Sequence, residues 1–422
     1  MRPRILLVLM ILLAGCSTPG GPSGTTPTTD GPSLPRPDFA APIDISGTQG
    51  GREPVIVLGN DGSIYVAAQD ETAGKPPHVW VSMDGAKTFR ETRPSSAAGG
   101  EIDIAVGKDL IFVTQLSPSG NVVSYSADNG QTWRQTPFPG TTYFERELVA
   151  VDAAGSAYLM ARFGLGALDQ GARPGEEASV ARSDDGGVTF LPVGRAWDAT
   201  HEPGTSIGNF HVQGSTLAIA YNCRDTKGVC FARSTDRGTT WSQQLVVARS
   251  VEVDNVYPIL AMTGARAVVT WSDASDGRLA VWAAASSDNG ASWSAPARVS
   301  ADDETATLPW IAMGGGRTWV VYLSTPRALV SAGTKDAVDT QWRAMAVQVD
   351  DRLSPLARGP ALPEPVHVGV ISKPVGRPGE DAPFDRRFGD FFTVAVDPRG
   401  RALVIVADTT HGSPRNLLAM QP

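Results

Sequence analysis

Residues Ser126 to Trp133 read S-A-D-N-G-Q-T-W, and four other stretches of the chain repeat this pattern. The other copies, two ending in Phe and two in Trp, are Ser82–Phe89, Ser183–Phe190, Ser234–Trp241 and Ser286–Trp293. Their starts lie about 50 residues apart, a period typical of propellers and other repeat arrays. The copies therefore predict one repetitive domain, not several unrelated ones.

The repeated pattern predicts a tight turn that ends in a buried ring. An Asp carboxylate can accept backbone N–H bonds, and Gly tolerates the positive φ of a tight turn. The terminal aromatic residue can then bury a large apolar face against a neighbouring unit. The copy from Ser82 has Ala86 where the others have Gly. We interpret all five copies as elements of the fold, which says little about chemistry.

The pattern resembles the Asp-box, or BNR, repeat of sialidase-like β-propellers, and the resemblance extends over nearly the whole chain after its N-terminal segment. It implies an all-β fold of four-stranded antiparallel blades, with the repeated turn between the third and fourth strands. Pairs of β-rich runs divided by a turn recur seven times, from Pro54–Leu58 with Ser63–Ala67 to Phe391–Val396 with Ala402–Ala407. We therefore expect a seven-bladed propeller. Six blades, the number usual in catalytic sialidases, is the alternative.

The last unit lacks a fourth strand. Ala41–Ser46 reads A-P-I-D-I-S and is similar to the fourth-strand ending A-P-A-R-V-S at Ala295–Ser300. We expect this N-terminal strand to complete the last blade and close the ring, which would protect the sheet edges.

The N-terminus predicts export. Arg2 and Arg4 precede the apolar run Ile5–Leu13, which is too short to span a membrane and is typical of a secretory signal. The run ends in L-A-G-C at Cys16, which resembles a bacterial lipobox and implies that Cys16 is lipidated after removal of residues 1–15. An ordinary signal peptide is the alternative. We expect a disordered tether over 16–38, a single propeller over 39–422, and a lipid-anchored chain facing the periplasm or the cell exterior.

Cys223 and Cys230 flank a predicted hairpin, and an exported chain favours a disulfide between them over free thiols. The histidines form no metal-binding pattern, and no phosphate or dinucleotide motif is present, so we expect neither a metal nor a cofactor. The net charge of −8 argues against nucleic acid as a partner. We expect a monomer that contacts the membrane only through its anchor.

Polar residues stand at the starts of the predicted inner strands, which converge on one mouth of the ring. The candidates for ligand binding are Arg52, Glu53, Arg146, Glu147, Asn209, His211, Asp254, Tyr257, Arg387 and Asp390. Several arginines at a ring mouth suit the carboxylate of an acidic sugar. The alternative is that these charges only solvate the mouth and pair with one another.

The sialidase resemblance assigns some of these residues catalytic roles. Arg52-Glu53-Pro54 is similar to the family's Arg-Ile-Pro motif, so Arg52, Arg146 and Arg387 would hold the substrate carboxylate. Asp70 or Glu71 would be the acid/base. The sequence departs from the family at the nucleophile, because Phe391 and Phe392 stand where a Tyr is expected, and Tyr257 is the remaining candidate.

Two functions of different classes follow. The first is an anchored, non-catalytic propeller that binds a glycan, an envelope component or a protein. The second is an exo-sialidase or related glycoside hydrolase. An arginine cluster sharing one pocket with a Tyr or paired carboxylates would favour the enzyme. The incomplete catalytic set favours binding.

Overall fold

The computed structural model describes residues 34–72, 74–94, 101–116, 122–137, 146–161, 179–198, 201, 203–224, 228–248, 254, 257–372 and 385–422. The predicted signal, Cys16 and residues 17–33 of the predicted tether lie outside the described residues. The account below concerns the unit from Leu34 to Pro422.

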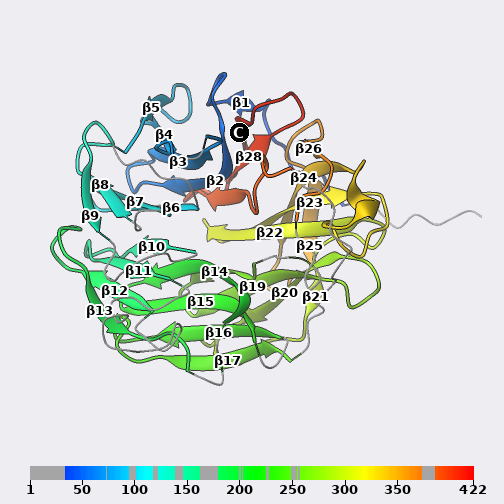
Figure 1. The fold of residues 1–422 in the computed structure, drawn as a ribbon. Helices are drawn as coiled ribbons and strands as arrows, with labels where there is room; N and C mark the ends of the chain where they lie inside the picture. Colours follow the sequence, from blue (N-terminus) through cyan, green and yellow to red (C-terminus); the bar gives the residue numbers. More distant parts are fainter. Residues whose placement is uncertain are drawn as a thin grey trace, which may run out of the picture. The chain divides into compact units, whose positions relative to one another are not determined.

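Within these residues the strands form seven antiparallel sheets that follow one another around a ring (Figure 1). Blades 1 to 3 comprise β2 (Gly51–Leu58), β3 (Ile64–Asp70), β4 (His78–Ser82), β5 (Arg90–Thr92); β6 (Ile102–Gly107), β7 (Leu110–Gln115), β8 (Val122–Ser126), β9 (Arg134–Pro137); β10 (Leu148–Val151), β11 (Ala157–Met160), β12 (Val180–Ser183) and β13 (Leu191–Gly194). Blades 4 and 5 comprise β14 (Pro203–Gln213), β15 (Thr216–Cys223), β16 (Val229–Ser234), β17 (Ser242–Val247); β18 (Ile259–Thr263), β19 (Arg266–Asp273), β20 (Ala280–Ser286) and β21 (Ala297–Arg298). Blades 6 and 7 comprise β22 (Thr305–Gly314), β23 (Arg317–Thr325), β24 (Gln341–Val349), β25 (Pro355–Pro360); β27 (Thr393–Val396), β28 (Ala402–Asp408), β29 (Arg415–Met420) and β1 (Ile43–Asp44).

The innermost strands close the ring. In chain order β2, β6, β10, β14, β18, β22 and β27 each contact the next, and β27 contacts β2. The seven-bladed prediction is therefore confirmed, and the six-bladed alternative is wrong. Blade 6 has an added strand, β26 (His367–Val368), which pairs with β24. The described residues contain no α-helix, only the 3-10 segment η2 (Lys335–Ala337), and no helix among them is long and apolar enough to cross a membrane.

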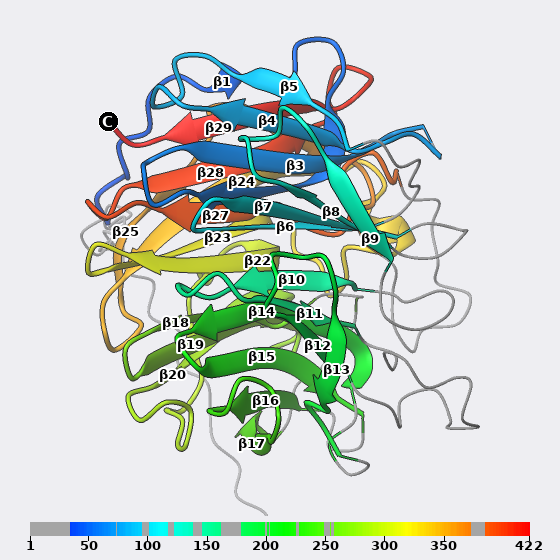
Figure 2. The ribbon, with the colours of Figure 1, turned by 90° about the vertical axis from the view of Figure 1, so that its left-hand side faces the viewer.

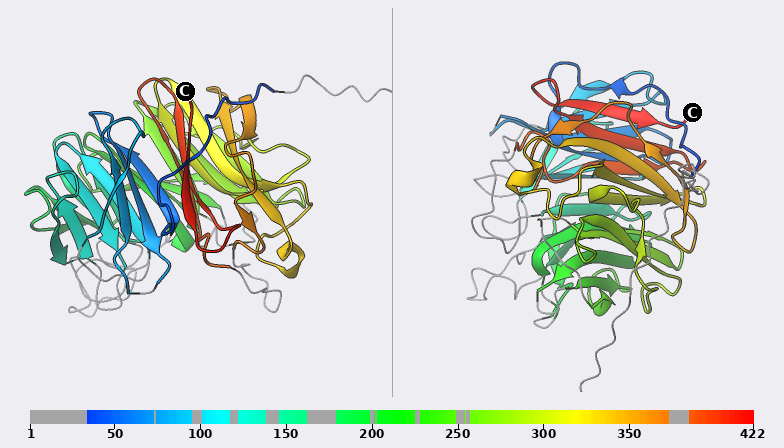
Figure 3. Two further views of the ribbon diagram at one scale, coloured as in Figure 1. Left: turned by 90° about the horizontal axis from the view of Figure 1, so that it is seen from above. Right: turned by 90° about the vertical axis from the view of Figure 1, so that its right-hand side faces the viewer.

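The two ends of the described chain meet in blade 7. Strand β1 pairs with β29, with Ile43 opposite Leu418, so the N-terminal strand completes the last blade as predicted. Figures 2 and 3 show this pairing as a blue strand beside a red one. The preceding residues also contact the ring, because the Arg358 N–H donates to the Pro35 carbonyl at 2.9 Å. The chain therefore packs on the propeller from slightly before the predicted start at residue 39.

Each repeated turn is held by one Asp and one Ser. In the second copy, the hydroxyl of Ser126 accepts from the Gly130 N–H at 2.8 Å and donates to Asp128 at 2.8 Å. Asp128 also accepts from the backbone N–H and hydroxyl of Thr132, at 2.8 and 2.6 Å. These hydrogen bonds lower the pKa of Asp128 to about 2. The same bonds recur around Asp84, Asp185, Asp236 and Asp288.

The turns join each blade to the preceding one. The ring of Trp293 lies 5.2 Å from that of Phe231 in the blade before it, and the Trp133 indole donates to Thr92 at 3.1 Å. The fourth strand of blade 1, which contains Thr92, thus becomes part of an interface instead of a free edge. In blade 4 a disulfide joins Cys223 and Cys230 across the β15–β16 hairpin, with Cα atoms 5.5 Å apart.

The structure predicts that only Gly is well tolerated at position 290, in the fifth repeated turn. Its φ is 81°, and a Cβ placed there would lie 2.3 Å from Phe231 Cε1. We expect Gly290→Ala to lower the free energy of unfolding by about 1–3 kcal/mol, through left-handed strain and overpacking. Ala86 already occupies the corresponding position in the first turn with φ 70°, so Ala86→Gly should change stability by less than about 1 kcal/mol. Urea denaturation of both variants checks this, and equal losses would contradict it.

Candidate functional site

Irregular strand entries position the polar residues of the mouth. The pairing of β2 with β3 is bulged at Glu53, whose φ is 54°. The left-handed conformation recurs at the entries of blades 3, 6 and 7, at Arg146, Leu308 and Gly389, with φ of 57°, 50° and 86°. Non-glycine residues adopt this region only where the surrounding structure holds them there. Bulges of this kind re-aim side chains, and here they bring charged residues of several blades together.

We call the resulting group the mouth cluster: Glu53, Glu101, Asp103, Arg146, Glu147, Tyr257 and Asp390. Hydrogen bonds across blades connect its members. The Arg146 N–H donates to Glu101 Oε2 at 2.6 Å, and the Asp390 N–H donates to Glu53 Oε1 at 3.0 Å. The Tyr257 hydroxyl donates to Asp390 Oδ2 at 3.3 Å. The cluster thus unites blades 1, 2, 3, 5 and 7.

Aromatic rings flank the one guanidinium of the cluster. Arg146 Cζ lies 4.1 Å from the centroid of the Tyr257 ring and 5.3 Å from that of Phe391. The Phe391 ring in turn lies 5.4 Å from that of Trp310, which is half-buried on β22. Cation–π contacts hold Arg146 flat against these rings. The mouth therefore combines an aromatic wall with carboxyl groups.

Burial changes the protonation states of the cluster. Burial, together with the charges of Asp390 and Glu101, raises the pKa of Glu53 to about 8. Burial also raises the pKa of Glu147 well above its ordinary value, and Glu101 adds to the effect. Burial raises the pKa of Asp103 to about 6. A pKa of about 8 keeps Glu53 mostly protonated at neutral pH, and burial favours the neutral form of Glu147. A neutral carboxyl can donate a hydrogen bond as well as accept one.

Asp103 and Glu147 differ in their bonding. Asp103 accepts from the backbone N–H groups of Val149 and Ile104, both at 2.9 Å, so it fastens blade 2 to blade 3. Glu147 is almost fully buried, yet within the described structure neither of its carboxyl oxygens has a hydrogen-bond partner. Such a group is costly to bury. Its free oxygens can serve a ligand.

Other predicted mouth residues have structural partners instead. Arg52 donates to Gln69 Oε1 at 2.8 Å, and Arg387 pairs with Asp385 and donates to the Gly412 carbonyl at 2.5 Å. Asp254 accepts from Ser331 and from the Ala332 N–H on the β23–β24 connection, at 2.5 and 2.8 Å. The three predicted arginines therefore have different partners: Gln69, the aromatic wall and Asp385.

The blade 4 candidates also bond to their neighbours. The Asn209 side chain exchanges two 2.8 Å hydrogen bonds with the backbone of Leu260. Burial lowers the pKa of His211 to about 4, so its imidazole is neutral at pH 7. Asp70 pairs with Arg93 at 2.8 Å on the side of blade 1 that faces blade 7, and Glu71 is exposed. Neither acidic residue is hydrogen-bonded to the mouth cluster within the described structure.

The sequence analysis missed Glu101, Asp103 and Gln69. Glu101 and Asp103 flank Ile102 at the start of the blade 2 inner strand, which is the position that identified Glu53 and Arg146. Applying the same rule to blade 2 would have found them. Gln69 donates to Glu53 from the neighbouring strand, a contact that no sequence spacing reveals. Among the described residues no group of three or more His, Cys, Asp and Glu is arranged to hold a metal ion.

Comparisons with known proteins show similarity of the fold alone. No protein-family model matches the chain, and no curated protein matches it in sequence. Among solved structures, an ulvan lyase bound to -[GlcA(1-4)Rha3S]- is 13% identical, with a TM-score of 0.50 over 92% of this chain and 94% of that one. A xyloglucanase from Xanthomonas campestris is 15% identical, with a TM-score of 0.49 over 87% of this chain and 52% of that one. A Hadza microbial sialidase is 14% identical, with a TM-score of 0.43 over 65% and 63%.

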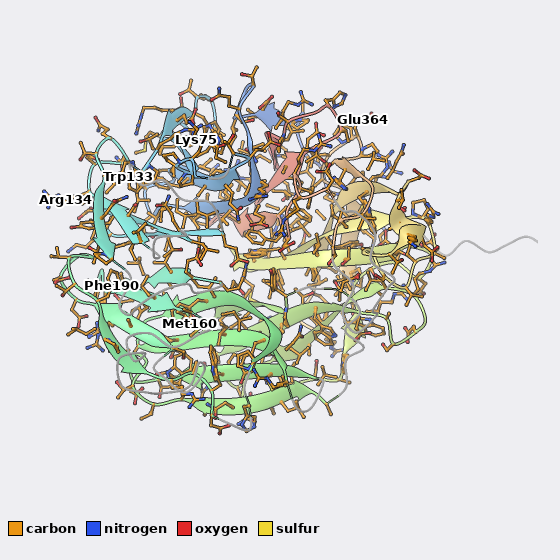
Figure 4. The ribbon with its side chains drawn as sticks, viewed as in Figure 1. Lys75, Trp133, Arg134, Met160, Phe190 and Glu364 are labelled. Carbon is orange, nitrogen blue, oxygen red and sulfur yellow. A yellow bond between two sulfur atoms is a disulfide. The ribbon has the colours of Figure 1, made fainter. Side chains whose placement is uncertain are left out.

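Glu53 predicts a pH dependence of stability. Its pKa in the folded chain is about 8 against an ordinary 4.5. The contribution of Glu53 to the free energy of unfolding is therefore fully present below pH 4.5 and is lost as the pH rises to about 8. Over this window the unfolded chain releases the proton and the folded chain keeps it, which costs up to about 1.4 kcal/mol per pH unit. We expect Glu53→Gln to flatten this fall in urea denaturation. Glu364→Gln, at an exposed position, is the control (Figure 4). If the free energy of unfolding varied with pH in the same way in Glu53→Gln and in the unsubstituted chain, the assignment would be contradicted.

Proposed function

We propose that the chain is a carbohydrate-binding β-propeller that holds an uncharged glycan at its mouth cluster and does not cleave it. The observation that carries this proposal is the mouth cluster itself. Carboxyl groups, a phenol and an aromatic wall converge there from separate blades. Sugars present hydroxyl groups that both donate and accept, and apolar ring faces that stack on aromatic side chains.

The charge balance favours an uncharged ligand. Carboxyl groups outnumber guanidinium groups in the cluster, and Arg146 is already close to the charges of Glu101 and Asp103. An acidic sugar would meet these carboxyl groups without a free arginine clamp. The protonated Glu53 can instead donate to a sugar hydroxyl, and burial favours the same neutral form in Glu147. The ulvan lyase of similar fold is bound to -[GlcA(1-4)Rha3S]-, which supports a saccharide as the ligand but not the absence of charge on it.

The absence of the expected nucleophile supports binding over catalysis. Phe391 and Phe392 stand at the start of the blade 7 inner strand, where sialidases would have their Tyr, and Phe has no hydroxyl. Arg52 and Arg387 are each engaged elsewhere, so three arginines do not share one ligand carboxylate.

A glycoside hydrolase is the second candidate, favoured by one observation. The Tyr257 hydroxyl donates to Asp390 at 3.3 Å, and the protonated Glu53 bonds to the Asp390 backbone. A phenol beside a carboxylate can act as a nucleophile with its base, and a protonated Glu can act as the acid. Burial and the nearby carboxylates raise the pKa of Tyr257 well above its ordinary value, which opposes this role.

The N-terminal and repeat assignments belong to the same proposal. The bonds around Asp84, Asp128, Asp185, Asp236 and Asp288 support Asp-box turns. The lipobox-like Cys16 supports an exported monomer held on a bacterial membrane, where its mouth would meet envelope glycans.

A glycan array with Tyr257→Phe tests the binding function. We expect the purified chain to bind uncharged oligosaccharides in preference to sialylated and uronate-containing ones. Tyr257→Phe should weaken this binding about tenfold, the cost of one hydrogen bond to a charged or strongly polar partner. Tyr65→Phe is the matched control, because the Tyr65 hydroxyl donates to Asn129 in a repeated turn, away from the mouth. Preference for sialylated glycans would contradict the proposal.

Fluorogenic glycosides separate the two candidates. We expect no turnover of sialosides or of uncharged aryl glycosides. Turnover abolished by Tyr257→Phe and by Asp390→Asn, but kept in Tyr65→Phe, would establish the hydrolase instead.

Cell fractionation tests the anchor. We expect the chain in the membrane fraction and Cys16→Ser in the soluble one, because lipidation requires the Cys thiol. Equal membrane retention of the two forms would rule out an anchor at Cys16.

A further inference from the structure

A cleft opens between blades 1 and 7, away from the mouth cluster. Alternate residues of β3 face blade 7, and the apolar Ile64, Val66 and Ala68 pack there with Ile405. The next residue on this face is Asp70, at the end of the strand. Beyond the apolar strip lies a cleft of about 610 Å³, a volume within the range of small-molecule sites. The residues that bound this cleft come from β3 to β5, from the β1–β2 and β3–β4 connections, and from Ser413 on the β28–β29 connection of blade 7.

A buried imidazole organises the cleft wall. The His78 side chain is 2% exposed and stacks on Trp80, with ring centroids 5.0 Å apart. Its Nε2 lies 3.3 Å from Asp70 Oδ2, and its Nδ1 lies 2.8 Å from Glu91 Oε1. Arg93 reaches the same two carboxylates, each at 2.8 Å. These contacts fix the polar atoms of the wall before any ligand arrives.

The lining is polar throughout and mixed in charge. Glu71 and Lys75 add further exposed charges, and hydroxyl or amide groups come from Gln49, Thr72, Thr92 and Ser413. Lys75 lies over blade 1 in Figure 4. Apart from His78, no described residue of the lining has a large aliphatic or aromatic side chain, which disfavours an apolar ligand.

We propose that the cleft between blades 1 and 7 is a second binding site, which takes an uncharged sugar residue. A carboxylate ligand would be attracted by Lys75 and Arg93 but repelled by Asp70, Glu71 and Glu91. An amine would meet the reverse, so neither charge is complementary to the whole wall. Hydroxyl groups satisfy both sets, because they accept from Arg93 and Lys75 and donate to the carboxylates. The site stands apart from the mouth cluster, because Asp70 faces blade 7 while Gln69, which bonds Glu53, faces the opposite way. It does not depend on binding at the mouth.

Saturation-transfer NMR on the full chain tests this site. The probes are the methyl glycosides of glucose, galactose, mannose and N-acetylglucosamine, with glucuronate and glucosamine as charged comparisons. We expect transfer to at least one methyl glycoside and weaker transfer to the charged sugars. Arg93→Gln should reduce affinity about tenfold, the loss of one charge-assisted hydrogen bond. Lys75→Ala, at an exposed position that cannot unfold the blade, should reduce it about threefold.

Matched variants test whether the saturation transfer comes from the cleft. Arg134→Gln and Lys87→Ala change exposed residues outside the cleft (Arg134 is at the edge of blade 2 in Figure 4), and both should leave the transfer unchanged. Tyr257→Phe weakens binding at the mouth, so the part of the transfer that depends on Arg93 and Lys75 should persist in that variant. The proposal is overturned if no methyl glycoside receives saturation, if charged sugars receive more, or if Arg93→Gln and Lys75→Ala bind as the unsubstituted chain does. Loss in Tyr257→Phe alone would assign the sugar to the mouth.

Discussion

Closure of the ring between its first and last blades is the constraint on which both sites depend. The amide of the fully buried Asn416 accepts from the Gly51 N–H at 2.7 Å and donates to the Gly51 carbonyl at 2.8 Å. It thereby replaces a strand partner where two blades meet, and each buried backbone group it satisfies would otherwise be costly. Thr393 does the same between Ile56 and Pro54. Glu53 and Asp390 come from opposite ends of the propeller sequence, and they meet only because these bonds hold the ends together.

The mouth cluster is stable because protonation removes part of its charge. Five ionised carboxyl groups around one guanidinium would repel one another strongly at low dielectric. Burial and mutual repulsion instead raise the pKa of Glu53 to about 8 and favour the neutral form of Glu147. This solution costs stability as the pH rises, since the unfolded chain does not hold those protons. Stability alone does not explain these buried carboxyl groups, because apolar residues of similar size would pack the mouth better. The cost fits a group kept for a ligand.

The fold could be predicted from the sequence more fully than the site. The turn from Ser126 to Trp133 carries its own hydrogen-bond partners within eight residues, so its five copies identified five blades. The seven recurring pairs of β-rich runs gave the number of blades. The position of a strand entry also identified Glu53, Arg146, Glu147, Tyr257 and Asp390. The partners of two other candidates could not be predicted, because they lie far away in the chain: Asp254 bonds Ser331, and Asn209 bonds Leu260. The added strand β26 left no repeat signal either, because it pairs out of the blade order.

The two proposed sites are linked by the register of a single strand. On β3, Gln69 turns toward the mouth and supports Glu53, whereas Asp70 turns toward blade 7 and supports the His78 wall. Because side chains alternate strictly along a strand, a slip by one residue would exchange these two environments and destroy both. The turn before β3 sets the register: the Gly59 N–H donates to the Ser63 carbonyl at 2.9 Å, and Asp61 accepts from the Ser63 N–H at 3.0 Å. A turn on one face of the ring thus positions two polar sites on the other.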